Sequence, residues 1–169
     1  MLANSAMTLG KQARKAGLSF RPVMPSDIHF LSQVYRSTRE EELAQTGWDK
    51  ARIDAFLEMQ FQAQHQHYQQ HYQNADWLII QSNAKDVGRF YIEELASEYR
   101  VIDIALLPEA RGHGMGHAIL SDTIELASSK GRAVGIHVEK TNPAISLYHR
   151  LGFTKTEDKG VYDLMHWRA

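Results

Sequence analysis

Cysteine is absent from this chain of 169 residues. This absence excludes disulfides, thiolate metal sites and a cysteine nucleophile, and it is compatible with the reducing cytoplasm in which we expect the protein to act. An excess of one charge is also missing, because 19 basic and 20 acidic side chains leave a formal net charge of −1. A nearly neutral chain gives no general reason to expect nucleic-acid or membrane partners. No run of about 20 apolar residues is present, so no bilayer-spanning helix is predicted.

The composition is otherwise that of an ordinary globular domain. Hydrophobic residues make up 43% of the chain and charged residues 23%, and the length suffices for one domain with a sizeable core. We expect a single domain over residues 18–169. Residues 1–17 are expected to form a tail or a short helix.

Apolar periodicity predicts the order of secondary-structure elements. Alternation over residues 18–23 predicts a first strand, and helical spacing after Asp27 predicts a first helix. Residues 40–47 are interpreted as a connection, after which Thr46 and Asp49 resemble a capping box for a second helix that reaches about Tyr72. The remaining elements are strands at 77–80, 87–95, 101–107 and 134–139, helices at 114–130 and after Asn142–Pro143, and closing strands at 153 and 161–167. The predicted order is β-α-α-β-β-β-α-β-α-β-β.

A glycine-rich stretch lies between a predicted strand and a predicted helix. Arg111 is followed by Gly112, Gly114 and Gly116. The first N–H groups of a helix have no intrahelical partner, the helix dipole adds positive charge there, and glycines let an anion approach the backbone. A Walker A loop would need Lys and then Ser or Thr, and a Rossmann fingerprint would need G-x-G-x-x-G. Neither is present, so the stretch predicts a different phosphate-binding loop, with a plain flexible turn as the alternative.

Two motifs in order resemble the GNAT superfamily of acyl-CoA-dependent N-acetyltransferases. Residues 111–116, RGHGMG, match its R/Q-x-x-G-x-G/A motif, and residues 142–153, NPAISLYHRLGF, match its second motif. The element order matches from about Ser19 to Arg168. The resemblance implies an α/β (α+β) fold with a mixed, mostly antiparallel sheet of six to seven strands and about four flanking helices. It also implies that the strands at 101–107 and 134–139 splay apart to admit CoA.

The resemblance implies how acetyl-CoA, the expected co-substrate, would bind. The pantetheine arm would pair with the backbone of the strand before the glycine loop. The pyrophosphate would accept hydrogen bonds from N–H groups of the loop, near the charge of an arginine. The implied CoA-binding residues are Ile104, Ala105, Leu106, Arg111, Gly112, His113, Gly114, Met115, Gly116, His117 and Asn142. Thr141 is an alternative to Asn142, which is also interpretable as a helix cap only.

The resemblance implies a general acid. Tyr148 matches the family tyrosine near the thioester sulfur, where it would protonate the departing CoA thiolate. The ordinary pKa of a tyrosine, about 10, suits proton donation at neutral pH. A buried tyrosine with a purely structural hydroxyl is the alternative.

The general base is less well defined by the resemblance. Family members often carry a glutamate on the strand before the loop, but the matching residue here is Ile102, which cannot accept a proton. His137 matches a base position on the following strand, and its ordinary pKa of about 6.5 is close to neutral. Asp103 is expected to face the opposite side of the strand from Ile102. The alternatives to His137 that stay open are Asp103, Glu93, Glu94 and water.

The resulting functional hypothesis is transfer of an acetyl group from acetyl-CoA to a primary amine. The amine of a small molecule or peptide would attack the thioester directly in a ternary complex, because a cysteinyl acyl-enzyme is impossible. The N–H of Leu106 would polarise the thioester carbonyl. A catalytically silent CoA-binding regulatory module and a transferase of a larger acyl group are the alternatives.

The sequence says less about the acceptor than about the binding of CoA. The run Glu40-Glu41-Glu42 suits either a cationic acceptor or solvent. His67 and His71 are four residues apart on a predicted helix but lack a third ligand, and no metal is expected. The expected partner is an amine-bearing acceptor, with no nucleic acid and no membrane, and the protein is expected to be a monomer or a homodimer.

Overall fold

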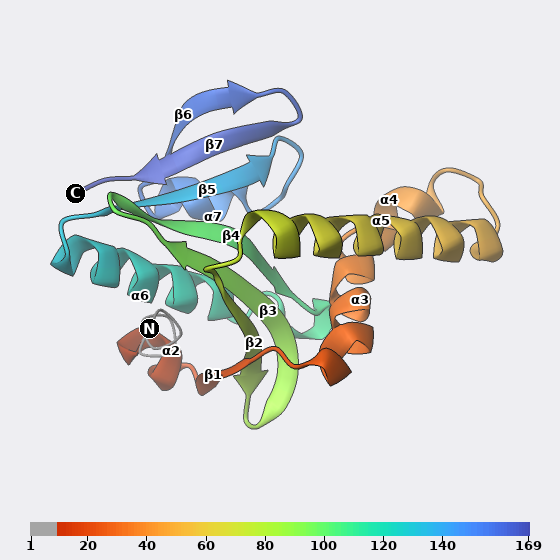
Figure 1. The fold of residues 1–169 in the computed structure, drawn as a ribbon, viewed down its shortest axis with the longest axis horizontal. Coiled ribbons are helices and arrows are strands. Elements are labelled where there is room, and N and C mark those ends of the chain that lie inside the picture. Colours follow the sequence, from red (N-terminus) through yellow and green to blue (C-terminus); the bar gives the residue numbers. More distant parts are fainter. Residues whose placement is uncertain (1–9) are drawn as a thin grey trace.

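The computed structural model describes residues 10–169, so residues 1–9 of the predicted tail lie outside the described residues. Seven strands form one open sheet in the order β1-β2-β3-β4-β5-β7-β6 (Figure 1). Neighbouring strands run antiparallel except for β4 and β5, which are parallel. The strands are β1 (Leu18–Pro22), β2 (Asp76–Ser82), β3 (Lys85–Glu94), β4 (Glu98–Leu106), β5 (Ala133–Glu139), β6 (Thr154–Lys159) and β7 (Tyr162–Trp167). This mixed, mostly antiparallel sheet confirms the predicted fold class.

Helices cover both faces of the sheet, and within residues 10–169 every helix is too short or too polar to cross a bilayer. The helices are α2 (Lys11–Lys15), α3 (Ile28–Ser37), α4 (Glu40–Ala44), α5 (Lys50–His71), α6 (Met115–Ser129) and α7 (Ile145–Arg150). Two 3-10 turns, η1 (Pro25–Asp27) and η2 (Pro108–Ala110), precede α3 and the glycine-rich stretch.

The strand alternation divides the core into two hydrophobic clusters. Leu78 and Ile80 of β2 pack with α2, α6 and α7, whereas Ile79 between them packs with α3 and α5. Successive strand side chains point to opposite faces, which produces this division. The molecule therefore has three layers, with α6 on one side of the sheet and α5 on the other (Figure 1).

The leading helix is held by a carboxylate from the middle of the chain. Ala13 of α2 is buried, and the side chain of Asp122 in α6 accepts hydrogen bonds from the backbone N–H groups of Gln12 at 3.0 Å and Ala13 at 2.8 Å. These N–H groups belong to the first turn of α2, where no intrahelical acceptor exists. Asp122 thus acts as the cap of a helix more than 100 residues away.

Three local expectations need correction. Residues 40–44 form helix α4 instead of a connection, and its three leading glutamates suit the positive end of the helix dipole. The N-cap of α5 is Asp49, whose carboxylate accepts from the N–H of Arg52. Helix α7 begins at Ile145, because Asn142 caps the preceding turn by accepting from the N–H of Ala144 at 2.9 Å.

Candidate functional site

The parallel strands β4 and β5 pair only at their amino ends. Residues 98–101 of β4 pair with residues 133–136 of β5, and the paired segment ends at Val101 and Ile136. Beyond that point the two strands part, and residues 102–106 of β4 are only half-buried. The predicted splay between these strands is therefore observed. We call the point of separation, after Val101 and Ile136, the fork.

The glycine-rich stretch lies at the open end of the fork, because β4 runs from the fork toward it. Gly112 and Gly114 adopt φ angles of +75° and +80°, which are strained for any residue with a side chain. A Cβ atom at either position would meet nothing within 4 Å, so the space beside the loop is open. Gly114 is the N-cap of α6, and the unpaired N–H groups of the first helical turn suit an anion there.

Arg111 uses its donors within the protein. Its Nε donates to the backbone carbonyl of Leu106 at 2.9 Å, and its Nη2 donates to the carbonyl and hydroxyl oxygens of Ser37 at 3.3 and 3.2 Å. Ser37 ends α3. Arg111 therefore ties the glycine loop to the end of β4 and to the end of α3. A direct role in phosphate binding stays a prediction.

A β-bulge at Ile102 decides which way Asp103 points. On β3, Tyr91 lies opposite Asp103 and Ile92 lies opposite Val101, which leaves Ile102 as the extra residue. Val101 belongs to the core under α6 and α7, whereas Ile102 packs toward α3 and α5. Asp103 also faces α5, since it accepts a hydrogen bond from Tyr68 of that helix. The expectation that Ile102 and Asp103 face opposite sides was therefore wrong.

Asp103 belongs to a buried polar cluster under α5. Arg89 is 3% exposed, and its Nη2 donates to Asp103 at 2.5 Å and to Gln64 at 2.8 Å. The Tyr68 hydroxyl donates to the same carboxylate at 3.3 Å. Burial, and then the charge of Asp103, raises the pKa of Tyr68. The cluster places a bound carboxylate beside the fork, and nothing in the local sequence signals the partnership of these three elements.

His137 is the first residue of β5 beyond the pairing with β4. Val134, Ile136 and Val138 belong to the core under α6 and α7, so His137 faces the opposite side, as Asp103 does. Burial, and then the positive charge of Arg100, lowers the pKa of His137. The imidazole is therefore more readily neutral than an exposed histidine, which suits a proton acceptor.

Tyr148 belongs to the hydrophobic cluster on the other face of the sheet, together with Val101 and Ile136. It is 4% exposed on α7 and packs edge-on against Phe153, with ring centroids 5.9 Å apart. Burial, and then the negative charge of Asp103, raises the pKa of Tyr148 to about 12. The hydroxyl therefore stays protonated at neutral pH.

The other candidate residues lie elsewhere or have structural partners. Glu93 and Glu94 pair with Arg100 and Tyr99, on the closed side of the fork, and Glu94 also binds Arg132. Asn142 caps a turn, as described above. The rings of His67 and His71 lie 4.2 Å apart on α5, and within residues 10–169 no group of three potential ligands is placed to hold a metal ion.

The remaining predicted CoA-binding residues follow the shape of the fork. Ile104, Ala105 and Leu106 lie on the half-buried part of β4 beyond the fork, and His113, Met115, Gly116 and His117 continue from the loop into α6. Residues that sequence reasoning missed are Tyr68, Arg89 and Ser37. Each contributes through a contact with a residue far away in the sequence.

Known proteins share both the loop region and the fold. A family model described as an acetyltransferase (GNAT) domain matches residues 73–155. A mycothiol acetyltransferase of Arthrobacter sp. (strain FB24) is 39% identical over 61 residues, which are 35% of this chain and 19% of that protein. A mycothiol acetyltransferase of Corynebacterium glutamicum (strain R) is 30% identical over 95 residues, 54% of this chain and 32% of that protein. The chain thus matches about a fifth to a third of the length of these relatives.

Solved structures show the same fold at low sequence identity. The PaiA N-acetyltransferase of Thermoplasma acidophilum, in complex with coenzyme A, superposes with a TM-score of 0.67 at 16% identity, over 90% of this chain and 99% of that chain. Naa50 of Arabidopsis thaliana, in complex with the bisubstrate analogue CoA-Ac-MVNAL, gives a TM-score of 0.57 at 15% identity, over 90% and 99% of the two chains. The fold is the one that these N-acetyltransferases share. The match over residues 73–155 identifies a GNAT acetyltransferase domain in this chain.

Proposed function

We propose that the protein transfers an acetyl group from acetyl-CoA to a primary amine by direct attack in a ternary complex. The observation that carries this proposal is the fork itself. Its open end carries a glycine loop before a helix N-terminus, an arrangement that suits an anion. Asp103 and His137 lie just beyond the paired parts of the two strands, and the charge of Asp103 acts on Tyr148. We also keep the expectations of a single domain, a cytoplasmic location and a monomer or homodimer.

The backbone of β4 supports a role in holding the thioester. The N–H of Leu107 donates to the carbonyl of Val87 on β3 at 2.8 Å. Neighbouring N–H groups of a strand point to opposite edges, so the N–H of Leu106 is directed into the gap between β4 and β5. A donor there would stabilise the negative charge that develops on the thioester oxygen. The pantetheine arm would lie along residues 104–106, and the pyrophosphate would lie on the loop.

The proton transfers follow from the groups at the fork. His137 takes a proton from the ammonium of the acceptor, which frees the lone pair of the amine. The amine then attacks the thioester carbonyl and the new C–N bond forms. The nitrogen loses its second proton to solvent as the C–S bond breaks. Tyr148 donates its proton to the departing thiolate, and its deprotonated oxygen regains a proton from solvent. The raised pKa of Tyr148, about 12, and the lowered pKa of His137 keep each group in the protonation state that precedes its transfer.

The acceptor amine is not defined by the similarity. Both relatives described above are named for mycothiol, and one structural neighbour is in complex with an analogue that carries the peptide sequence MVNAL. The names of these proteins have acetyl transfer in common and differ in the acceptor. We therefore restrict the proposal to a primary amine of a small molecule or a peptide.

A regulatory CoA-binding module is the second candidate. Ile102 stands where family members often carry a carboxylate base, and the neighbouring Asp103 is bound to Arg89 and Tyr68. Such a protein would bind CoA without turnover. A transferase of a larger acyl group is a variant of the main proposal, for which the fork would accept a longer chain.

Release of free CoA thiol from acetyl-CoA, measured with a panel of polyamines, amino acids, aminoglycosides and N-terminal peptides, tests the proposal. Saturable thiol release with at least one amine is expected, and butyryl-CoA in place of acetyl-CoA tests acyl length. Calorimetric titration with CoA runs in parallel. Tight CoA binding with no thiol release for any amine would replace the proposed transferase by the regulatory module.

A further inference from the structure

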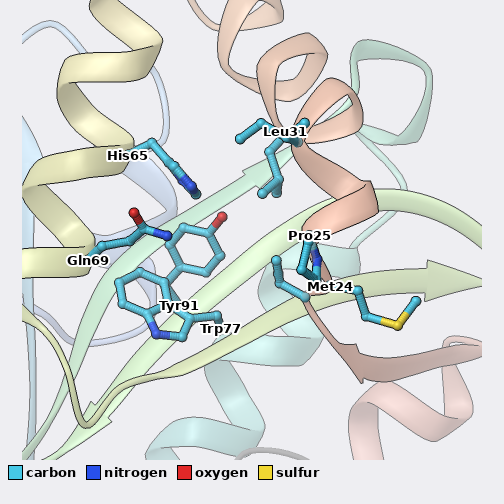
Figure 2. A pocket seen from close by; sticks show the side chains of 9 residues that line it. Met24, Pro25, Leu31, His65, Gln69, Trp77 and Tyr91 are labelled. Atoms are coloured by element: carbon cyan, nitrogen blue, oxygen red, sulfur yellow. The ribbon is translucent and has the colours of Figure 1, made fainter.

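A pocket of about 510 Å³ opens on the face of the sheet that carries α3 and α5 (Figure 2). Trp77 of β2 and Tyr91 of β3 form its floor. His65 and Gln69 reach into it from α5, opposite the wall formed by η1 and α3. Its volume lies within the range of about 300–1,000 Å³ that is typical of small-molecule sites.

The walls of the pocket favour a flat aromatic ligand. The rings of Trp77 and Tyr91 meet edge to face with centroids 4.7 Å apart, and the imidazole of His65 forms a third ring surface. Met24, which is 52% exposed, lies at the rim, and Figure 2 shows its sulfur directed away from the aromatic side chains. Contacts between aromatic rings stabilise a flat ring more than an aliphatic group of the same area.

The charges around the pocket favour a neutral ligand. No lysine, arginine, aspartate or glutamate lines it. The buried guanidinium of Arg89 lies behind the floor, with its central carbon 5.2 Å from the centroid of the Tyr91 ring. Asp103 pairs with this guanidinium, so the two charges largely cancel and favour neither an anionic nor a cationic ligand. Burial, and then the charge of Arg89, lowers the pKa of His65. Gln69, the neutral imidazole of His65 and the Tyr91 hydroxyl offer hydrogen bonds to a polar edge.

The pocket lies one strand away from the fork. Tyr91 is the register partner of Asp103 in β4. Tyr68 stands beside both residues, since its ring meets that of Tyr91 edge-on at 6.0 Å and its hydroxyl donates to Asp103. An occupant of the pocket would therefore contact Tyr91, whose ring packs against Tyr68, one of the residues that hold the carboxylate at the fork.

We propose that this pocket binds a neutral planar aromatic group with one hydrogen-bonding edge, such as an indole or a phenol. The group is either a free ligand or the aromatic end of an acceptor whose amine lies elsewhere. Neither source requires a charged contact inside the pocket. The binding itself is independent of the proposed transferase reaction.

Ligand-observed NMR titration of the full chain with indole and with 4-methylphenol tests the proposal. For ligands of this size we expect saturable binding with a dissociation constant on the order of 0.1–1 mM. Ile28 lines the pocket and is 39% exposed, so Ile28→Trp fills the pocket without disturbing the core. This variant should weaken both probes by about tenfold or more.

Two matched controls accompany that variant. Met59→Trp places the same side chain at a position of α5 that is 58% exposed and does not line the pocket, and it should leave the affinity unchanged. Gln69→Leu should weaken the probes several-fold, whereas Gln66→Leu, at an exposed residue of the same helix outside the pocket, should not. Equal affinity in the wild type and Ile28→Trp, or no saturation by either probe up to about 10 mM, would overturn the proposal.

A turnover arm, which rests on the proposed function, distinguishes the two sources of the ring. If the ring belongs to the acceptor, Ile28→Trp raises the KM for tryptamine by about tenfold and leaves the KM for propylamine unchanged. If the ring belongs to a free ligand, indole binding weakens and neither KM changes. An absence of turnover with every amine would contradict the transferase proposal alone, because the NMR titration does not depend on turnover.

Discussion

Two stretches of the chain border the fork, and they contribute to it through different parts of their residues. The motif segment, residues 98–153, works mainly through its backbone, with glycines at positive φ before a helix N-terminus and strand N–H groups that face a gap. The helical segment, residues 28–72, works through side chains that meet residues far away in the sequence. A site built from local backbone leaves a pattern in the sequence, whereas a site built from distant side chains leaves none.

The distant contacts of the helical segment are specific. Arg39, between α3 and α4, binds the carboxylate of Glu139 at the end of β5. Tyr68 of α5 donates to Asp103, and Ser37 accepts from Arg111. These contacts fix the helices over the open part of the fork, where an acceptor would enter. Breaking a contact between the two segments should therefore have a different effect from a change within the motif segment alone.

The largest effect is expected for Asp103→Asn, which removes the charge partner of Arg89. The guanidinium is 3% exposed, and an unpaired buried charge typically costs about 3–5 kcal/mol of stability. We expect a loss near the lower end of that range, because the amide oxygen of Asn still accepts a hydrogen bond. Urea denaturation measures it. Asp54→Asn, in an ion pair on α5 that is more accessible to water, is the control and should lose much less.

The bulge at Ile102 explains why this cluster could not be predicted. The element order, the mixed sheet and the splayed strands follow from apolar periodicity and the resemblance, because they depend on local patterns. The direction of Asp103 depends instead on a register shift between β3 and β4, which the sequence of β4 alone does not encode. In the same way, the donors of Arg111 could not be assigned to Ser37, since that residue lies 74 positions earlier.

Tyr148→Phe should have the next largest effect and should act on rate alone. Loss of a general acid typically lowers turnover by about 100-fold or more. No hydrogen bond from the Tyr148 hydroxyl is found within residues 10–169, so its removal should leave stability and CoA affinity unchanged. Steady-state kinetics, thermal denaturation and CoA titration measure the three quantities. Full activity in this variant would dismiss the acid role and weaken the functional reading of the motif segment.

His137→Ala is expected to lower turnover by about tenfold, less than Tyr148→Phe, because water reaches this half-buried residue and can relay the proton. The wild-type rate should rise with pH as the imidazole loses its proton. Since burial and Arg100 lower the pKa of His137, that rise should lie below pH 6.5, its ordinary pKa. The variant should lack this acidic limb and bind CoA normally. A pH–rate profile identical to that of the wild type would remove His137 from the mechanism.

The smallest effect separates two glycines within the motif segment. Gly114 has a φ of +80°, so Gly114→Ala should cost about 1 kcal/mol of stability even though its Cβ would meet nothing within 4 Å. Gly116 lies in the first turn of α6, and its Cβ would come no nearer than 3.8 Å to Leu147, so Gly116→Ala should stabilise the chain by about 0.5 kcal/mol. Denaturant titrations of both variants measure the difference. If the two alanines behave alike, the conformation of the loop backbone does not explain its glycines, and close approach of a ligand is the remaining physical reason for them.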